Sequence, residues 1–493
     1  MSPAATVRTG TLVGVEAIPV QVEVDIGPGI PGFSIVGLPD ASVQEARERV
    51  RSALRAQGYS VPNARIVVNL APGPLRKSGS GFDLPIASAI LLATRQIPST
   101  VVGGSLLVGE LSLSGEVRPV PGILAYGLAA RESAHDLLSA QPHEGDLGLV
   151  GLEHRCIASL ADLKNERYAD PTSARSLMGS DAPSVDFGQV AGHELPKRAL
   201  MLAAAGDLGL LMVGPPGSGK TMLARRLSTI LPPLSDADRL ETALIHSVAG
   251  LDTTRIAFGE RPFRAPHHSA STAGLVGGGS PPRPGEISLA HNGVLFLDEV
   301  PEFAPSVLQA LRQPLEDGEV TLVRAEGRIR YPAAFTLIAA ANPCPCGFLG
   351  DPERPCTCAP ERALRYRSRI GGPLMDRIDM VVDVARQDPR HVLSPKGSVE
   401  STTLSALVER ARERAGRRGV PVRSMTAAQV VRSGRIDGPT ERHLLRLGKG
   451  LRLTGRGMTR LLRVARVVAD VEDSDAITVD HLTEAAGYRA REV

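Results

Sequence analysis

The chain has 493 residues, enough for two to four domains at about 100–200 residues each. Its 56 Lys and Arg against 53 Asp and Glu give a formal charge of +3, and a hydrophobic content of 42% excludes a mainly disordered chain. Aromatic residues make up 3% and Trp is absent, which argues against a base-stacking platform for single-stranded nucleic acid. No apolar run approaches the ~20 residues that span a bilayer, and no signal-peptide pattern opens the sequence. The expectation is a cytoplasmic enzyme without membrane contact.

The first 165 residues predict an α+β domain, because short β-branched runs alternate with helical patterns. Helices are expected at 40–57, where Asp40 is the N-cap and Gly58 follows the end, and at 83–93. Residues 166–186 are polar and small, which is typical of a linker. The strands expected in this domain lie at 11–15, 20–26, 33–36, 65–70, 106–113 and 115–120.

Residues 187–386 show a different pattern, with buried apolar strands at 208–213, 293–297 and 334–340 separated by helical stretches. This alternation predicts a three-layer α/β module around a mostly parallel sheet. A loop is expected over 387–398, and residues 399–493 form a helical tail with more basic than acidic residues. That surplus fits either a solvated surface or a nucleic-acid contact. The helices expected in the tail lie at 402–417, 424–434, 438–447, 455–470 and 478–488.

A phosphate-binding pattern, G-x-x-x-x-G-K-T, follows the strand at 208–213 and opens a helix. Backbone N–H groups of such a loop bind phosphates, Lys220 reaches the β- and γ-phosphates, and the Thr221 hydroxyl binds Mg²⁺. The sequence therefore predicts an ATP site with Mg²⁺ as cofactor. The residues of the loop are Gly214, Pro215, Pro216, Gly217, Ser218, Gly219, Lys220 and Thr221.

Two acids and an amide follow the next buried strands. Asp298 and Glu299 end the strand at 293–297, and unpaired charge at a buried strand end is costly without a function. Asp298 is expected to hold Mg²⁺ and Glu299 to deprotonate the attacking water. Asn342 follows the strand at 336–341 and is expected beside the γ-phosphate, where it polarises the water or senses the phosphate; an ordinary Asn-Pro turn is the alternative.

Four of the five cysteines lie within fifteen residues: Cys344, Cys346, Cys356 and Cys358. The two C-x-C pairs are separated by turn-forming residues, so the loop 344–358 can fold back and bring four thiolates together. We expect a structural Zn²⁺ site here, with a loop of reduced thiols as the alternative.

These motifs together resemble the magnesium-chelatase-like AAA+ ATPases of the YifB/ComM competence family, over nearly the whole chain. The resemblance implies an N-terminal domain of the ribosomal-S5-domain-2/Lon-protease-like type (1–165), an AAA+ core (187–386) and a C-terminal helical lid (399–493). It also implies a homohexameric ring and, from ComM, a DNA helicase that drives branch migration during natural transformation. Besides the phosphate loop, the motifs that carry the resemblance are FSIVGLPD at 33–40, FDLPIA at 82–87, RAPHHS at 264–269, LFLDE at 295–299 and ANPCPCG at 341–347.

The resemblance also assigns roles to two arginines. Arg377, in the segment LMDRID, corresponds to the arginine finger that reaches a neighbouring subunit's γ-phosphate. Arg456 opens a lid helix in the position of the second sensor of bound ATP, with Arg460 as the alternative one turn later. For each arginine, an ordinary surface salt bridge is the competing interpretation. His267 and His268 are expected to brace a loop.

The Lon-like domain raises the possibility of an ATP-dependent protease, which needs a Ser-Lys dyad. Matching the motifs places the nucleophile at Gly81 and the lysine at about Leu124, and no lysine occurs from residue 78 to 163. Neither position can do the chemistry, so this domain is expected to be non-proteolytic.

Two segments are candidates for DNA contact. Residues 319–335 have a hairpin pattern with a Gly-containing turn, and members of the related MCM-like branch project a hairpin at this point into the ring's channel. Arg324, Arg328 and Arg330 would then meet phosphates, as would Arg283 on the loop 277–284. The sequence thus predicts a hexameric, ATP- and Mg²⁺-dependent DNA motor acting on single-stranded or branched DNA. The alternatives are a chelatase-like ATPase that remodels a protein partner and a regulatory ATPase without a DNA track.

Overall fold

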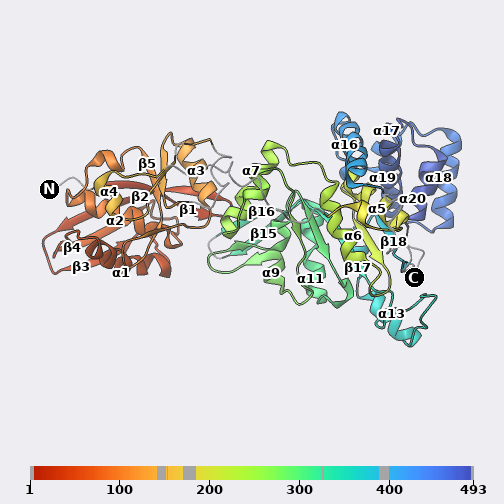
Figure 1. Cartoon of the computed structure of the whole chain (residues 1–493), viewed down its shortest axis with the longest axis horizontal. Helices are drawn as coiled ribbons and strands as arrows, with labels where there is room; N and C mark the ends of the chain where they lie inside the picture. The colour runs from red at the N-terminus through yellow and green to blue at the C-terminus, as the bar shows by residue number, and fades with distance from the viewer. Residues whose placement is uncertain are drawn as a thin grey trace.

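The computed structural model describes residues 5–141, 151–152, 154–169, 185–324, 327–387 and 399–489. Three parts follow one another along the long axis of the molecule: an N-terminal α+β domain, a central α/β module and a group of C-terminal helices (Figure 1). The described part of the chain contains no helix that combines the length and apolar character needed to traverse a bilayer.

The N-terminal domain is built on a seven-stranded mixed sheet in the order β3-β4-β2-β1-β5-β8-β9. Helices α1 (Ala41–Ala56) and α2 (Asp83–Ala93) pack on one face, and α3 (Ile123–Glu132) packs on part of the other. A short β6 (Glu110–Leu111) and β7 (Val117–Arg118) pair beside the sheet, and α4 (Ala161–Asn165) follows its last strand. The strands of the sheet are β1 (Ala5–Val13), β2 (Glu16–Gly27), β3 (Gly32–Val36), β4 (Arg65–Ala71), β5 (Ser105–Val108), β8 (Asp136–Ser139) and β9 (His154–Cys156).

The predicted helices of this domain match closely, whereas the first strand does not. Asp40 caps α1 by accepting from Val43 N at 2.9 Å, as expected. The first strand begins at Ala5 and ends at Val13, because Gly14 has φ +66° and turns the chain before Val15. Ala169 bridges to Cys156, so the domain reaches that residue; positions 170–184 of the expected linker lie outside the described residues.

The central module holds a five-stranded parallel sheet in the order β11-β14-β17-β10-β18. Strand β10 lies between β17 and β18, although both of these strands come much later in the sequence. The strands are β10 (Leu210–Val213), β11 (Phe263–Arg264), β14 (Val294–Leu297), β17 (Thr336–Ala341) and β18 (Met380–Asp383). The helices are α5 (Glu194–Gly206), α6 (Lys220–Arg226), α7 (Asp236–Ala249), α8 (Thr254–Ala257), α9 (Thr272–Val276), α10 (Glu286–Leu289), α11 (Pro305–Ala310), α12 (Arg312–Asp317), α13 (Pro360–Ser368) and α14 (Gly372–Met375).

Two hairpins depart from this sheet. Strands β15 (Glu319–Arg324) and β16 (Gly327–Pro332) form the predicted hairpin, and β12 (Gly277–Gly278) pairs with β13 (Arg283–Pro284) across the predicted loop. The Tyr331 hydroxyl donates to Pro282 O at 3.0 Å, so the two hairpins are joined.

The C-terminal helices share one apolar core with the central sheet. Helix α19 is buried along most of its length and packs on α5, α16, α17 and α20. The core therefore runs from Leu210 and Phe296 in the sheet to Val467 and Leu482 in the helices. The helices are α16 (Ser401–Arg417), α17 (Ala427–Ser433), α18 (Gly438–Gly450), α19 (Gly455–Val471) and α20 (Val479–Gly487).

The N-terminal domain docks on the central module through α3 and α7. Ser247 of α7 satisfies the open N-terminus of α3: its carbonyl accepts from Gly122 N at 2.7 Å, and its hydroxyl accepts from Leu124 N at 3.3 Å. A small apolar cluster completes the contact, in which Leu124 packs with Leu234, Ala243 and Ile256. Because the contact combines backbone hydrogen bonds with buried apolar side chains, it fixes the orientation of α3 on α7.

Candidate functional site

The phosphate loop lies at the carboxyl end of β10, as predicted, and leads into α6. Gly217 and Gly219 have φ of +76° and +88°, conformations that side chains disfavour. A Cβ on Gly214 would lie 2.1 Å from Val384 O, so the start of the loop also requires glycine. The loop backbone can therefore curl as a phosphate cradle requires.

Lys220 and Asn342 lie together inside this loop. The Lys220 ammonium donates to Gly214 O at 2.8 Å, to Pro215 O at 3.0 Å and to the Asn342 side-chain oxygen at 3.2 Å. Burial lowers the pKa of Lys220, and the carboxylates of Asp298 and Glu299 act against that shift. The predicted pair of a phosphate-binding lysine and a water-polarising amide is thus brought together.

Thr221 and Asp298 form the second contact of the site. The Thr221 hydroxyl donates to Asp298 Oδ2 at 2.6 Å, which places the two predicted Mg²⁺ ligands side by side. Glu299 follows with a left-handed backbone (φ +52°), and its N–H donates to Asp298 Oδ1 at 2.9 Å. Its side chain is half exposed and lies 3.5 Å from His268 Nδ1.

The loop carries an unused polar atom that fits a phosphate. Ser218 is 3% exposed, and its hydroxyl oxygen is buried without a hydrogen-bond partner. A buried hydroxyl without a partner is unfavourable, so it indicates that a bound group completes the site. The donor set of Lys220, Thr221 and Asp298 matches the groups that hold a nucleotide with Mg²⁺.

The cysteine-rich loop brings its four thiols together, as predicted. The ligand atoms of Cys344, Cys346, Cys356 and Cys358 all lie within 4.8 Å of one another. Backbone N–H groups of Phe348 and Thr357 lower the pKa of Cys346 to about 5, whereas burial and the neighbouring thiols raise the pKa of Cys356 to about 12 and also raise that of Cys358. Four sulfur donors at this spacing fit a closed tetrahedral Zn²⁺ site.

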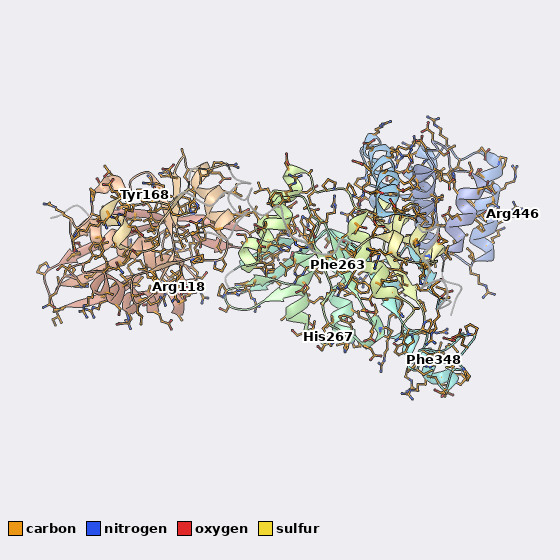
Figure 2. The ribbon with its side chains drawn as sticks, viewed as in Figure 1. Arg118, Tyr168, Phe263, His267, Phe348 and Arg446 are labelled. Carbon is orange, nitrogen blue, oxygen red and sulfur yellow. The ribbon has the colours of Figure 1, made fainter. Side chains whose placement is uncertain are left out.

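This cysteine loop rests on the phosphate loop. A Cβ on Gly347 would lie 2.5 Å from Pro216 Cδ, so the two loops touch. Arg367 donates to Pro343 O at 3.0 Å, and the Arg386 guanidinium lies 5.5 Å from the Phe348 ring centre. Figure 2 shows Phe348 where this loop projects from the central module. The geometry of the cysteine loop therefore affects the residues that follow Asn342.

Arg377 and Arg456 lie at the opposite edge of the sheet from the chain's own phosphate loop. They line a cleft of about 670 Å³ that also includes Gly209 and Phe335, which immediately precede β10 and β17. Arg377 is 10% exposed and pairs with Glu316. Burial and the guanidinium groups of Arg312, Arg456 and Arg460 lower its pKa. The cleft thus brings several arginines together with acidic side chains such as Glu316 and Asp376.

The two sensor candidates differ in how their guanidinium groups are used. Arg456 is 70% exposed and lies 3.5 Å from Asp376 Oδ2. Arg460 is largely buried and donates to Met375 O at 2.7 Å and to Ile378 O at 3.1 Å, which holds the segment around Arg377. Since Arg456 faces away from its own phosphate loop, a sensor role requires nucleotide bound by another subunit.

The arginines predicted to meet DNA are exposed on the two joined hairpins. Arg328 and Arg330 lie on one face of the β15–β16 hairpin, where they pair across the strands with Val323 and Thr321. Arg324 lies on the other face, and its guanidinium reaches the backbone beside Gly278. Arg283 is exposed on β13. The four side chains therefore lie on the two joined hairpins of the central module, with Arg324 on the other face from Arg328 and Arg330.

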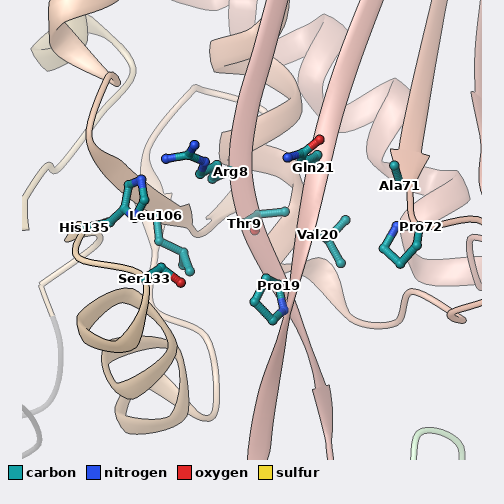
Figure 3. A pocket seen from close by; sticks show the side chains of 10 residues that line it. All are labelled: Arg8, Thr9, Pro19, Val20, Gln21, Ala71, Pro72, Leu106, Ser133 and His135. Carbon is teal, nitrogen blue, oxygen red and sulfur yellow. The ribbon is translucent and has the colours of Figure 1, made fainter.

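The N-terminal domain shows no Ser-Lys dyad at the positions compared. Gly81 and Leu124 are both buried. The ammonium of nearby Lys77 donates to the carbonyls of Gly37 and Pro72. A hollow of about 480 Å³ in this domain is lined by Arg8, Ser133 and His135, among others, and includes neither dyad position (Figure 3).

Sequence reasoning missed His193 and the contact of His268 with Glu299. His193 is buried with φ +58°, and its Nε2 would lie 3.7 Å from a Cβ on Gly219 in the phosphate loop. Burial, with help from Lys197, lowers the pKa of His193. The motif PHHS marked His268 as a residue of interest, but a single sequence gives no signal that pairs it with Glu299.

Family models match three stretches of the chain. The model described as magnesium chelatase, subunit ChlI, matches residues 186–392. The model described as subunit ChlI of Mg-chelatase matches residues 22–141, and the one for the ChlI C-terminal region matches 398–489. These matches cover the three structural parts in order.

Individual relatives match over the full length. The uncharacterized protein YifB of Salmonella typhimurium is 43% identical over 495 residues, covering 99% of this chain and 97% of YifB. Competence protein ComM of Haemophilus influenzae is 40% identical over 508 residues, covering 99% of this chain and 97% of ComM. The magnesium-chelatase 38 kDa subunit of Rhodobacter capsulatus is 25% identical over 328 residues, covering 62% of this chain and 86% of the subunit. The chain therefore belongs to the YifB/ComM family of magnesium-chelatase-like AAA+ ATPases.

Proposed function

We propose that the protein is an ATP-driven motor that acts on DNA as a homohexameric ring, with ComM-like helicase or branch-migration activity. The observation that carries the ATPase is the convergence of Lys220, Thr221, Asp298 and Asn342 within hydrogen-bonding distance. Lys220 and the loop N–H groups hold the phosphates of ATP, and Thr221 and Asp298 hold Mg²⁺, which neutralises charge on the transferred phosphoryl group.

In this proposal Glu299 is the general base. Glu299 takes a proton from water as the water oxygen bonds to the γ-phosphorus. The bond between that phosphorus and the β–γ bridging oxygen breaks, and its electron pair leaves with ADP. Asn342 orients the same water from the neighbouring strand end.

Replacing Glu299 tests the hydrolysis step. Glu299→Gln should keep ATP binding and lose about 10²–10⁴ in turnover, because the positioned base is removed. Lys220→Ala should weaken ATP binding itself. The readouts are phosphate release and binding of a fluorescent ATP analogue. Glu302→Gln is the matched control, because Glu302 is exposed and lies five residues after the end of β14. Full turnover in Glu299→Gln would remove Glu299 from the mechanism.

The cleft that contains Arg377 and Arg456 supports the proposal of a ring. Because Arg377 and Arg456 lie at the sheet edge away from their own phosphate loop, they complete an ATP site only on a neighbouring subunit. A finger supplied in trans stabilises charge on the transferred phosphoryl group. The observed salt bridge to Glu316 is then a contact of the isolated chain.

Mixing inactive proteins tests this shared site. Arg377→Ala mixed with Lys220→Ala should regain ATPase activity, because some interfaces combine an intact loop with an intact finger. Lys220→Ala mixed with Glu299→Gln is the control, since both lesions fall in the same nucleotide site and no interface is repaired. Equal behaviour of the two mixtures, with co-assembly confirmed by light scattering, would contradict a finger in trans.

The DNA part of the proposal is supported by the exposed arginines of the β15–β16 hairpin and of β13. Few aromatic residues are needed for this mode, because a ring motor can grip the phosphate backbone. A chelatase-like ATPase that remodels a protein partner is the alternative, and the likeness to a magnesium-chelatase subunit favours it.

DNA binding as a function of salt separates these functions. Arg328→Ala should lower the slope of log K against log salt by ~0.7–0.9, the contribution of one phosphate contact, for all sequences alike. Arg118→Ala, exposed on β7 of the N-terminal domain, is the matched control and should leave the slope unchanged (Figure 2). Undetectable DNA binding at low salt with ATP present would support the remodelling alternative.

A structural Zn²⁺ held by the four cysteines is part of the same proposal. It would brace the stretch after Asn342, and with four thiolates as ligands it leaves no open position for catalysis. The protein purified without a metal-affinity tag should contain about one zinc per chain. Cys356→Ser/Cys358→Ser should contain none, and Cys156→Ser, buried in the N-terminal domain, should keep it. A metal-free parent with full ATPase activity would exclude this role.

A further inference from the structure

His268 and Glu299 meet because their strands are neighbours. Strands β11 and β14 run parallel, with Arg264 paired to Leu295. The segments that leave their carboxyl ends therefore reach the same edge of the sheet. There His268 Nδ1 lies 3.5 Å from Glu299 Oε2.

The backbone of Glu299 makes this contact possible. A left-handed conformation is uncommon for a residue with a side chain, and such conformations concentrate at functional sites. The conformation has φ +52° and is supported by the bond from Glu299 N to Asp298 Oδ1. It turns the chain directly after Asp298, so the two carboxylates diverge: Asp298 turns to Thr221, and Glu299 turns to His268.

His268 is itself held in place by its loop. Its ring lies tilted against the ring of His267, with 4.1 Å between ring centres and 34° between the ring planes. His267 Nδ1 contacts the Ser269 hydroxyl at 2.8 Å, and Ala270 N donates to His267 O at 2.9 Å, which closes a turn. At the end of β11, Arg264 binds both carboxylate oxygens of Glu286 at 2.7 Å. The histidine is thus presented by a loop tied at both sides.

We propose that His268 is a positioning residue for Glu299: its imidazole holds one carboxylate oxygen and leaves the other directed to the attacking water. The inference rests on the proposed ATPase and adds a residue to its machinery. A half-exposed carboxylate samples many rotamers, so a fixed partner raises the fraction of subunits with the base in position. His268 acts through Glu299 and does not touch the nucleotide in this assignment.

A double-mutant cycle on the full-length protein tests this inference. His268→Ala should lower kcat about 10- to 100-fold, the usual effect of misplacing a catalytic group, with KM for ATP nearly unchanged. In a Glu299→Gln background the same substitution should have no further effect, because the group it positions is absent. His268→Asn, which keeps a side-chain donor, should restore part of kcat.

His443→Ala is the matched control, since His443 lies on α18 and contacts the Thr483 hydroxyl rather than Glu299. Wild-type kcat in His268→Ala, or an equal loss in the Glu299→Gln background, would overturn the positioning role. Absence of ATP hydrolysis in the unmodified protein would instead contradict the proposed function. Binding of the fluorescent ATP analogue by each variant shows that the nucleotide site remains folded.

Discussion

The parallel, in-register pairing of β14, β17 and β10 is the constraint from which the nucleotide site follows. Leu297 pairs with Ala339, and Val213 pairs with Ala341, so the three strands end at one edge of the sheet. Strands buried on both faces cannot slip by one residue without turning core side chains into the wrong layer. The groups just beyond the strands, Lys220, Asn342 and Asp298, are thereby held within reach of one another, although long stretches of chain separate them. The chemistry of this edge depends on a hydrogen-bond register set inside the core.

The same sheet carries two different groups of charged residues at its two edges. The carboxyl edge carries the phosphate loop with its two acids, and the amino edge carries the cleft with Arg377 and Arg456. Burial and the guanidinium groups of Arg312, Arg456 and Arg460 lower the pKa of Arg377, which pairs with Glu316 within the chain. The phosphate loop and these arginines thus lie at opposite edges of the sheet, which is the geometry that head-to-tail contact between copies requires.

Features with local signals could be predicted from the sequence. Helix α1 begins after a capping aspartate, α2 spans the predicted residues, and the phosphate loop is marked by its glycines. Other features depend on contacts between distant segments. Strand β18 has four residues and no alternation, and it forms only because β10 offers a free edge. The positions of Arg456 and His268 follow from how α19 packs on the sheet and how β11 pairs with β14. The residue types were recognisable, but their partners were not.

The contact between α3 and α7 has a consequence for experiments on fragments of this protein. Helix α7 presents Ala243, next to Leu234 and Ile256, to an apolar cluster that Leu124 completes from the other domain. A recombinant fragment that begins at residue 185 keeps the entire nucleotide site but brings this face into water. Exposed apolar patches promote self-association. A large particle size of the fragment in light scattering would therefore report association through the exposed face of α7 rather than ring assembly. The two are distinguished by size, since a ring has a closed stoichiometry and an apolar aggregate does not.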